Sequence, residues 1–435
     1  MPNKFGMRSA HEPTQNIEGQ TVKDLVTEFG SPLFVISEKK LRKNYRNARQ
    51  AFQTRYPKVQ FAWSYKTNYL DAVCNIYHQE GSWAEVVSGF EYDKAIRNGV
   101  PGSKIIFNGP DKTDTDLRKA ITNNSLIHID HLDELYMLQD IARESKMRPR
   151  VAIRVNMDIG VYPIWDRFGF NYESGQAWDA LNKIMFSGLM DLVGLHTHIG
   201  TFMLSPNTYA VAASKLAHLA QSVLNKYNHE IKYIDMGGGF ASKNTLKGSY
   251  LPGSDVSPSI HDFAEAITSA LMNSDYRPKT PPVLIIESGR ALIDDAAWLL
   301  GTVLANKRLS DGRRATILDI GVNTLFTAFW YDHLITPAQP ITSYTEDTAL
   351  YGPLCMNIDV VRENVNLPLL NRGDHVVVHH VGAYNMTQWL QFITLRPNVL
   401  LIDEEGGKHL IRRGETLDTI TSQEIMPAHL AHFDL

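Results

Sequence analysis

The sequence VQFAWSYKTN at residues 59–68 is an apolar run that ends in polar and titratable residues. The run has the length and composition of a buried β-strand, and Lys66 lies near its carboxyl end. Further short apolar runs follow it, with stretches of helix-like sequence between them. They begin at residues 82, 104, 125, 150, 192, 231 and 283. This alternation predicts a (β/α)8 TIM barrel, in which functional groups gather at the carboxyl ends of the strands.

The chain is too long for one barrel alone. It has 435 residues, whereas single domains cluster near about 100–250 residues. After Arg290 the pattern becomes β-rich, and EEGG near residue 405 lies between two strand-like runs, as in a hairpin. We therefore expect an N-terminal segment (1–36) that packs with a β domain, a barrel (37–290) and a C-terminal, mostly antiparallel β domain (291–435).

Charge and composition exclude several classes of protein. The net charge is −4 and no stretch concentrates lysine and arginine, so no nucleic-acid partner is expected. No apolar run reaches the roughly 18–20 residues that a membrane span needs, and the polar amino terminus lacks the apolar core of a signal peptide. Two cysteines, Cys74 and Cys355, form no disulfide framework. These features predict a cytoplasmic protein without a membrane partner.

Lys66 is the first candidate for chemistry. Burying a charged lysine is costly, so we expect the pKa of Lys66 to be lowered. A neutral lysine amine is the nucleophile that forms a Schiff base with a carbonyl compound. The structural alternative is a lysine that extends from the strand end into solvent.

A glycine run and two charged residues indicate an anion site. Gly237, Gly238 and Gly239 follow the strand-like run IKYIDM, and backbone amides without side chains can approach a phosphate closely. Glu287 ends the eighth run and requires a cationic partner if it is buried. Arg290, three residues later, could bind a phosphate or a carboxylate. A tight turn without a ligand and a structural Glu–Arg pair are the alternatives.

Two histidines and one cysteine remain as candidates. His196 and His198 alternate along a strand, so they should point to opposite sides, and we predict no metal site. One of the two imidazoles could instead stack on a planar cofactor. Cys355 follows Gly-Pro on a predicted loop, where it could be a proton donor or an inert thiol.

In their order along the chain, these motifs resemble the pyridoxal-phosphate-dependent decarboxylases of fold type III. This group contains diaminopimelate, ornithine and biosynthetic arginine decarboxylases and is related to alanine racemase. The resemblance extends from about residue 30 to about residue 400. It implies an alanine racemase-like barrel, pyridoxal 5'-phosphate as cofactor, an amino acid as the small-molecule substrate, and a homodimer with shared active sites.

The resemblance also assigns roles to residues near the reactive end of the cofactor. Lys66 in SYKTN is similar to the lysine that binds the cofactor covalently, and Glu85 in AEVVSG to an acidic residue beside it. Arg154 in AIRVN resembles the arginine of the strand-end polar network. His198 in HTHIGT resembles the imidazole stacked on the cofactor ring. Glu287 resembles the carboxylate that keeps the pyridine nitrogen protonated, which suits decarboxylation because the protonated ring accepts electrons.

The remaining roles concern the phosphate and the product. By resemblance, Gly237, Gly238, Gly239 and Arg290 bind the phosphate, and Tyr384 in GAYN lies beside it. Cys355 in GPLCMNID resembles the cysteine that the neighbouring subunit contributes to protonate the product.

Four positions depart from the pattern of diaminopimelate decarboxylases. Met356 and Asn357 replace the usual Glu-Ser after the cysteine, and Thr327 occupies the position of the arginine that binds the distal carboxylate. Asp332 in WYDH resembles the aspartate that ornithine decarboxylases use for the distal amine. We therefore expect a basic amino acid of the ornithine or lysine type, or an amino-acid unit of a specialised metabolite, rather than meso-diaminopimelate.

Three alternative functions remain open at this point. The first is diaminopimelate decarboxylase proper. The second is an amino-acid racemase of the same fold, against which Glu287 and Cys355 argue. The third is a catalytically silent paralogue that binds the cofactor, against which Lys66, His198, Cys355 and Tyr384 argue.

Overall fold

The computed structural model describes residues 12–341 and 344–431. These residues divide into two compact units. One unit contains residues 38–296 together with 380–387, and the other contains the described residues of 1–37, 297–379 and 388–435. The segment 380–387 thus belongs with the barrel, although we expected it in the β domain. The barrel unit also extends past Arg290, because a short helix and a 3-10 turn follow that residue before the next strand begins at Ala297.

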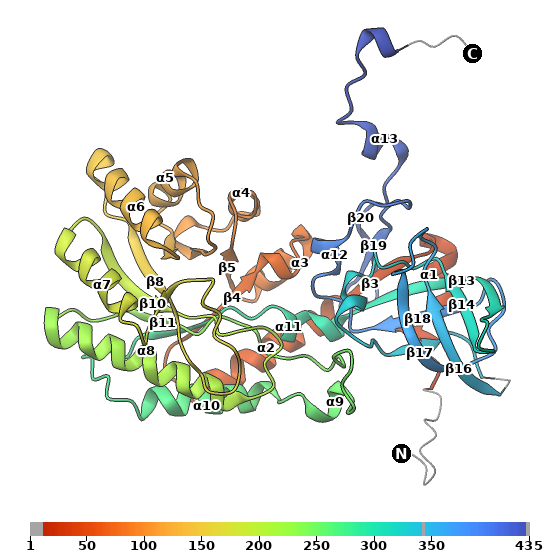
Figure 1. The fold of residues 1–435 in the computed structure, drawn as a ribbon, viewed down its shortest axis with the longest axis horizontal. Coiled ribbons are helices and arrows are strands. Elements are labelled where there is room, and N and C mark those ends of the chain that lie inside the picture. Colours follow the sequence, from red (N-terminus) through yellow and green to blue (C-terminus); the bar gives the residue numbers. More distant parts are fainter. Residues whose placement is uncertain (1–11, 342–343, 432–435) are drawn as a thin grey trace. The chain divides into compact units, whose positions relative to one another are not determined.

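The first unit is a closed parallel barrel of eight strands, as predicted (Figure 1). The strands pair in the order β10-β11-β12-β4-β5-β6-β7-β8, and pairing between β10 and β8 closes the barrel. They are β4 (Val59–Ser64), β5 (Trp83–Val86), β6 (Ile105–Phe107), β7 (Leu126–Ile129), β8 (Arg150–Asn156), β10 (Asp191–His196), β11 (Tyr233–Asp235) and β12 (Val283–Ile286). A short strand, β9 (Phe170–Asn171), pairs with the end of β8.

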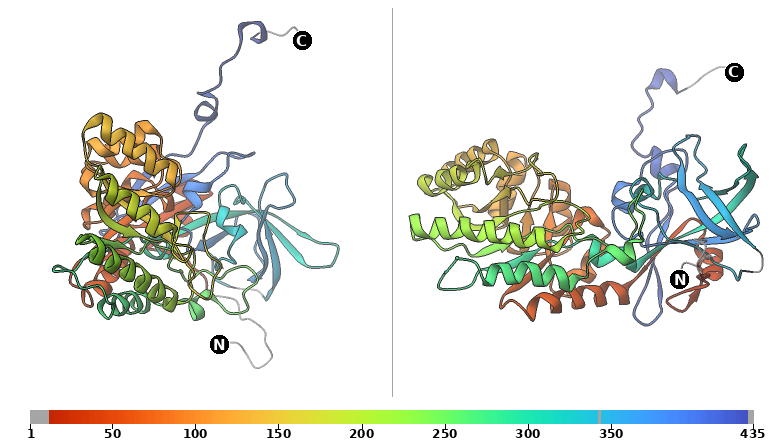
Figure 2. Two further views of the ribbon diagram at one scale, coloured as in Figure 1. Left: turned by 60° about the vertical axis from the view of Figure 1, so that its left-hand side comes forward. Right: turned by 60° about the horizontal axis from the view of Figure 1, so that its bottom comes forward.

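Helices surround the barrel strands, as Figures 1 and 2 show. The longer ones are α2 (Glu38–Gln53), α3 (Asp71–Gln79), α4 (Gly89–Arg97), α5 (Asp114–Thr122), α6 (Leu132–Ser145), α7 (Gln176–Ser187), α8 (Pro206–Tyr227) and α10 (Ile260–Met272). Short helices α9 (Gly253–Val256) and α11 (Arg290–Ile293) lie after β11 and β12. Alternating residues of the strands form an apolar layer that includes Ala62, Ile106, Leu126, Ala152, Val193, Tyr233 and Ile285. This layer holds the strand ends, and therefore the polar residues that follow them, in fixed positions.

The second unit is a mostly antiparallel sheet. Its strands pair in the order β17-β16-β14-β13-β3-β19-β20, and β18 pairs with both β13 and β15. They are β3 (Leu33–Ser37), β13 (Ala297–Arg308), β14 (Arg314–Leu318), β15 (Ile335–Pro337), β16 (Thr345–Tyr351), β17 (Val360–Pro368), β18 (His375–His379), β19 (Asn398–Ile402) and β20 (Lys408–Arg412). Helix α1 (Val22–Phe29) contributes Val22 and Leu25 to the apolar core of this unit.

None of the helices in the described residues combines the length and the apolar composition that a membrane-spanning helix needs.

Candidate active site

Lys66 and Glu85 form a close ion pair at the end of the barrel. Lys66 lies in the 3-10 turn η1 (Tyr65–Thr67), which directly follows β4. Its Nζ donates hydrogen bonds of 2.7 and 2.8 Å to the two carboxylate oxygens of Glu85, a fully buried residue of β5. Burial acts to lower the pKa of Lys66, but the carboxylates of Glu85 and Glu287 outweigh it and raise the pKa above its usual range. Our expectation of a lowered pKa was therefore wrong.

Glu287 is the central carboxylate of the site. It directly follows β12 and is buried. Its Oε1 accepts a hydrogen bond of 2.6 Å from Nδ2 of Asn108, which also donates to Glu85 at 3.0 Å. Asn108 follows β6 and thus connects the two carboxylates. Burial raises the pKa of a third carboxyl, Asp235 at the end of β11, well above its usual range, and the Glu287 carboxylate raises it further.

His196 lies inside the barrel beside Glu287. Its Nε2 is 3.4 Å from Oε2 of Glu287, and its ring lies 4.6 Å from the ring of His128. Burial, with a smaller effect of Arg154, lowers the pKa of His196 well below its usual range, so the ring is neutral and makes no ion pair with Glu287. His128, His196 and Glu287 place potential ligand atoms within 4.8 Å of one another, the one such group found among the described residues.

His198 contacts a different set of residues from His196. Nδ1 of His198 accepts a hydrogen bond of 3.2 Å from the backbone N–H of Gly238, and Trp165 lies 5.7 Å from the imidazole. Burial lowers the pKa of His198 well below its usual range, and Arg154 acts in the same direction. The ring is thus neutral, and because Nδ1 is the acceptor, its proton lies on Nε2.

The glycine run needs its lack of side chains. Gly237 has a φ of +65° and Gly239 a φ of +90°, the left-handed region that side chains disfavour. A Cβ on Gly238 would lie 2.3 Å from the backbone oxygen of Glu287. The run therefore brings the backbone directly against the residue that ends β12.

Arg290 and Tyr384 lie next to each other. The Arg290 guanidinium is 4.7 Å from the centre of the Tyr384 ring, and Nη2 donates to Oγ1 of Thr201 at 3.2 Å. Tyr384 has a φ of +64°, which is rare for a residue with a side chain. Its N–H donates to the backbone oxygen of Thr67 at 2.9 Å, so Tyr384 is held beside the residue that follows Lys66.

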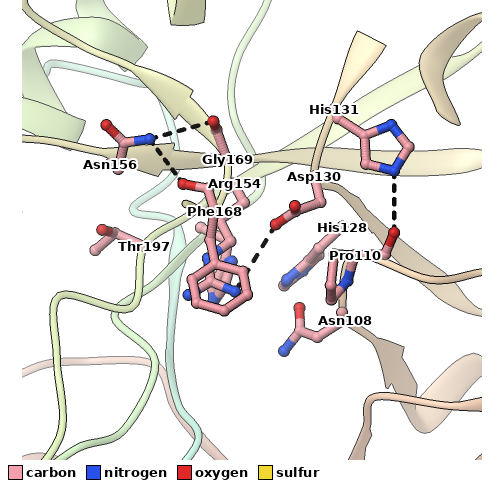
Figure 3. A network of polar contacts seen from close by, with 12 residues as sticks. Asn108, Pro110, His128, Asp130, His131, Arg154, Asn156, Phe168, Gly169 and Thr197 are labelled. Carbon is pink, nitrogen blue, oxygen red and sulfur yellow. Dashed lines mark hydrogen bonds and ion pairs between the residues drawn. The ribbon is translucent and has the colours of Figure 1, made fainter. Parts of the chain in front are cut away.

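Arg154 is positioned by an aromatic ring and a carboxylate (Figure 3). Its guanidinium is 4.4 Å from the centre of the Phe168 ring and 3.8 Å from Oδ1 of Asp130. Phe168 lies in the segment that follows β8. Nδ2 of Asn156 fixes this segment by donating hydrogen bonds to the backbone oxygens of Phe168 at 2.7 Å and Gly169 at 3.2 Å. The arginine at the end of β8 is therefore held by the segment that follows it.

Several of these side chains line one pocket in the barrel unit. It is lined by Ser64, Lys66, Thr67, His198, Thr201, Gly239, Glu287, Gly289, Arg290 and Tyr384. Glu85 and Gly238 contact these residues directly, and Gly237 and Arg154 lie close to them.

The predicted residues of the second unit lie on its loops and turns. Thr327 is buried, and its Oγ1 is 2.8 Å from Nε2 of His333. Oδ1 of Asp332 lies 3.6 Å from Nε of Arg362, so this carboxylate has a cationic partner within the unit. Cys355 is exposed and forms no disulfide. Asn357 is also exposed, whereas Met356 is half-buried.

A family model described as "Pyridoxal-dependent decarboxylase, pyridoxal binding domain" matches residues 38–294. The chain belongs to this family. The resemblance seen in the sequence is thus confirmed, and the protein is a decarboxylase of amino acids that binds pyridoxal phosphate. The pocket fits this cofactor, because it combines a lysine amine, a buried carboxylate, an arginine and a glycine run that a Cβ would obstruct.

Relatives that match the chain along nearly its whole length include several diaminopimelate decarboxylases. The enzyme of Methanothermobacter thermautotrophicus is 29% identical over 426 residues, which cover 95% of this chain and 96% of the relative. The crystal structure of the enzyme of Methanocaldococcus jannaschii has a TM-score of 0.87 and 27% identity, covering 97% of this chain and 98% of that one. A second structure of that enzyme, in complex with L-lysine, has a TM-score of 0.87 and 28% identity, covering 95% and 96%.

These similarities correct our expectation about the substrate. We expected an ornithine- or lysine-type substrate, or a unit of a specialised metabolite, but relatives that match nearly the whole chain are diaminopimelate decarboxylases. The structure explains part of the error. Asp332, which we took as the partner of a distal amine, is already paired with Arg362.

Several residues of the site were not predicted from the sequence. His128 and Asp235 were missed, although each lies at or near the end of a barrel strand. Thr67, Thr201 and Gly289 were missed because they follow strand ends without a titratable side chain. Strand-end position was the signal that could have found His128 and Asp235.

Proposed function

We propose that this protein is a diaminopimelate decarboxylase, which removes one carboxylate of diaminopimelate as carbon dioxide and leaves lysine. The observation that carries the proposal is the similarity along nearly the whole chain to enzymes of this name. The similar fold of an enzyme crystallised in complex with L-lysine, the product of this reaction, also supports it.

When bound, pyridoxal phosphate accepts the electron pair that is left on the α carbon when the carboxylate departs as carbon dioxide. In the proposal, Lys66 holds the cofactor covalently and Glu85 orients the Lys66 amine through two hydrogen bonds. Glu287 keeps a proton on the pyridine nitrogen. The 2.6 Å hydrogen bond from Asn108 fixes the Glu287 carboxylate for this task.

The remaining residues bind and shield the cofactor in this proposal. The neutral imidazole of His198 would stack on the cofactor ring, and the N–H of Gly238 fixes the orientation of this imidazole. Gly237, Gly238, Gly239, Arg290 and Tyr384 bind the phosphate. Arg154 keeps a positive charge at the end of β8, near Glu85 and Glu287.

We also propose a homodimer in which Cys355 of one subunit serves the active site of the other. The Cys355 thiol is exposed on a loop of the second unit, so it is accessible to a second chain. There the thiol would donate a proton to the α carbon, and this proton would take the place of the carboxylate lost as carbon dioxide. The resemblance in GPLCMNID supports this role.

The substrate proposal is tested most directly at the distal end of diaminopimelate, which carries the second carboxylate and the second ammonium. Thr327 supplies no cation for the second carboxylate and Met356 no anion for the second ammonium. The test is to incubate the purified holoenzyme with meso-diaminopimelate, lysine and ornithine separately and to measure carbon dioxide and amine products. We expect carbon dioxide and lysine from meso-diaminopimelate. Release of carbon dioxide from another amino acid, with none from diaminopimelate, would refute the substrate assignment.

A further inference from the structure

A buried carboxyl group outside the set of residues described so far connects three segments of the barrel unit. Asp294 lies in the 3-10 turn η3 (Asp294–Ala296), which follows helix α11 and is four residues from Arg290. Its Oδ2 accepts hydrogen bonds from Oγ of Ser242 at 2.5 Å and Nδ2 of Asn244 at 3.0 Å. Its Oδ1 accepts the backbone N–H of Ala383 at 3.1 Å.

Each donor belongs to a segment that also contributes to the pocket. Ser242 and Asn244 lie on the loop that leaves the glycine run, and Ala383 immediately precedes Tyr384. The same segments are tied together by two further hydrogen bonds. Nδ2 of Asn244 donates to the backbone oxygen of His380 at 2.9 Å, and the N–H of Gly382 donates to the backbone oxygen of Asp294 at 3.3 Å.

Tyr384 requires such support because its backbone has a φ of +64°. A residue with a side chain keeps this conformation only when its surroundings enforce it. Two consecutive N–H groups are held: that of Ala383 by Asp294, and that of Tyr384 by the backbone oxygen of Thr67. The result is a tyrosine ring 4.7 Å from the Arg290 guanidinium.

A carboxylate suits this junction better than a neutral side chain. Three donors converge on it, two at Oδ2 and one at Oδ1, and an ionised carboxylate accepts at both oxygens without carrying a proton that would need an acceptor of its own. Burial raises the pKa of Asp294 to about 6, while the nearby charge of Arg290 acts in the opposite direction. The three donors and the charge of Arg290 favour the ionised form, which can accept all three hydrogen bonds.

We propose that Asp294 is a positioning residue for the phosphate of the cofactor: it holds Tyr384 and the loop after the glycine run in place beside Arg290. The proposal rests on the assignment of Arg290 and Tyr384 to the phosphate. It does not depend on which amino acid the enzyme decarboxylates.

The test compares two probes that differ only in the phosphate. Pyridoxal phosphate and pyridoxal are titrated into cofactor-free protein, and their dissociation constants are measured for the wild type, Asp294→Ala and Asp294→Asn. We expect Asp294→Ala to weaken the binding of pyridoxal phosphate by about tenfold, which is the effect of losing a buried hydrogen-bond acceptor. The affinity for pyridoxal should stay unchanged. Asp294→Asn keeps an acceptor oxygen and should recover part of the loss. Hydrogen–deuterium exchange of the cofactor-free protein should increase at residues 380–387 in the alanine variant.

Asp262→Ala is the matched control. Asp262 is an exposed carboxylate that also accepts hydrogen bonds from a serine hydroxyl and a backbone N–H, both of Ser259 at the start of α10. It should change neither dissociation constant nor the exchange at 380–387. If Asp294→Ala does not fold, the same dissociation constants are measured for Ser242→Ala, which removes one hydrogen-bond donor to Asp294.

Two results would overturn the proposal. One is unchanged affinity for pyridoxal phosphate in the Asp294 variants. The other is equal weakening of pyridoxal phosphate and pyridoxal, which would show a general structural effect. Absence of activity on diaminopimelate would refute the proposed substrate and would leave these binding measurements unaffected.

Discussion

Replacing Gly238 with alanine tests the close approach of the glycine run to Glu287. The new Cβ would lie 2.3 Å from the backbone oxygen of Glu287, whereas real Cβ atoms essentially never come within 3.0 Å, so the two backbones must separate by about 0.7 Å. The N–H of Glu287 donates a hydrogen bond of 2.8 Å to the backbone oxygen of Gly237, so this movement also displaces the carboxylate of Glu287. Overpacking of this kind costs about 1–3 kcal/mol of stability. A displacement near 1 Å in an active site can cost about a hundredfold in rate.

The assay measures the dissociation constant for pyridoxal phosphate, the turnover and the melting temperature of Gly238→Ala. We expect weaker cofactor binding and a turnover lower by about a hundredfold. Gly248→Ala is the control, because Gly248 has a φ of +77° and no atom lies within 4 Å of the position that a Cβ would occupy there. That variant should lose stability through backbone strain and keep its affinity for the cofactor. Normal affinity and turnover in Gly238→Ala would refute the reasoning.

Three further predictions concern the proposed roles. Borohydride reduction of the holoenzyme should attach the cofactor to Lys66, as peptide mass analysis would show, and a label on another lysine would contradict the assignment. Glu287→Gln should retain the cofactor but lower turnover by about two orders of magnitude or more, because a charge that acts in the transition state is lost; near-normal turnover at full cofactor occupancy would argue against the role. Mixing inactive Lys66→Ala with inactive Cys355→Ala should restore part of the activity through hybrid dimers with one intact site, and no recovery despite measured subunit exchange would exclude shared sites.

The barrel could be predicted because its strands are short apolar runs that end in polar residues. Strand ends of a closed parallel barrel must meet at one rim, so Lys66, His198 and Glu287 were expected near one another, and all three line one pocket. The segment 380–387 could not be placed in the same way. It follows β18, a strand of the other unit, and only tertiary contacts such as the hydrogen bond between Tyr384 and Thr67 place it with the barrel.

The ionisation of Lys66 shows why position alone was insufficient. Burial was correctly inferred to lower its pKa, but the sign of the net shift depends on which charges lie nearby. Glu85 is distant from Glu287 in the sequence, yet Asn108 brings the two carboxylates together beside the lysine through hydrogen bonds of 3.0 and 2.6 Å. Only the three-dimensional structure reveals this pairing.

The error about the substrate has the same origin. Asp332 was read as a free anion for a distal amine, because the sequence shows the residue type and not its partner. In the structure its carboxylate lies 3.6 Å from the Arg362 guanidinium, and Arg362 also donates to the backbone oxygen of His333 at 2.9 Å. His333 in turn lies 2.8 Å from Thr327, so the two positions used to assign the substrate belong to one hydrogen-bonded cluster. A carboxylate that already has a cationic partner gains less from a substrate ammonium, because that ammonium must compete with the partner for the same oxygens. The residue type at Asp332 alone is therefore no argument against diaminopimelate, because the carboxylate already has a cationic partner.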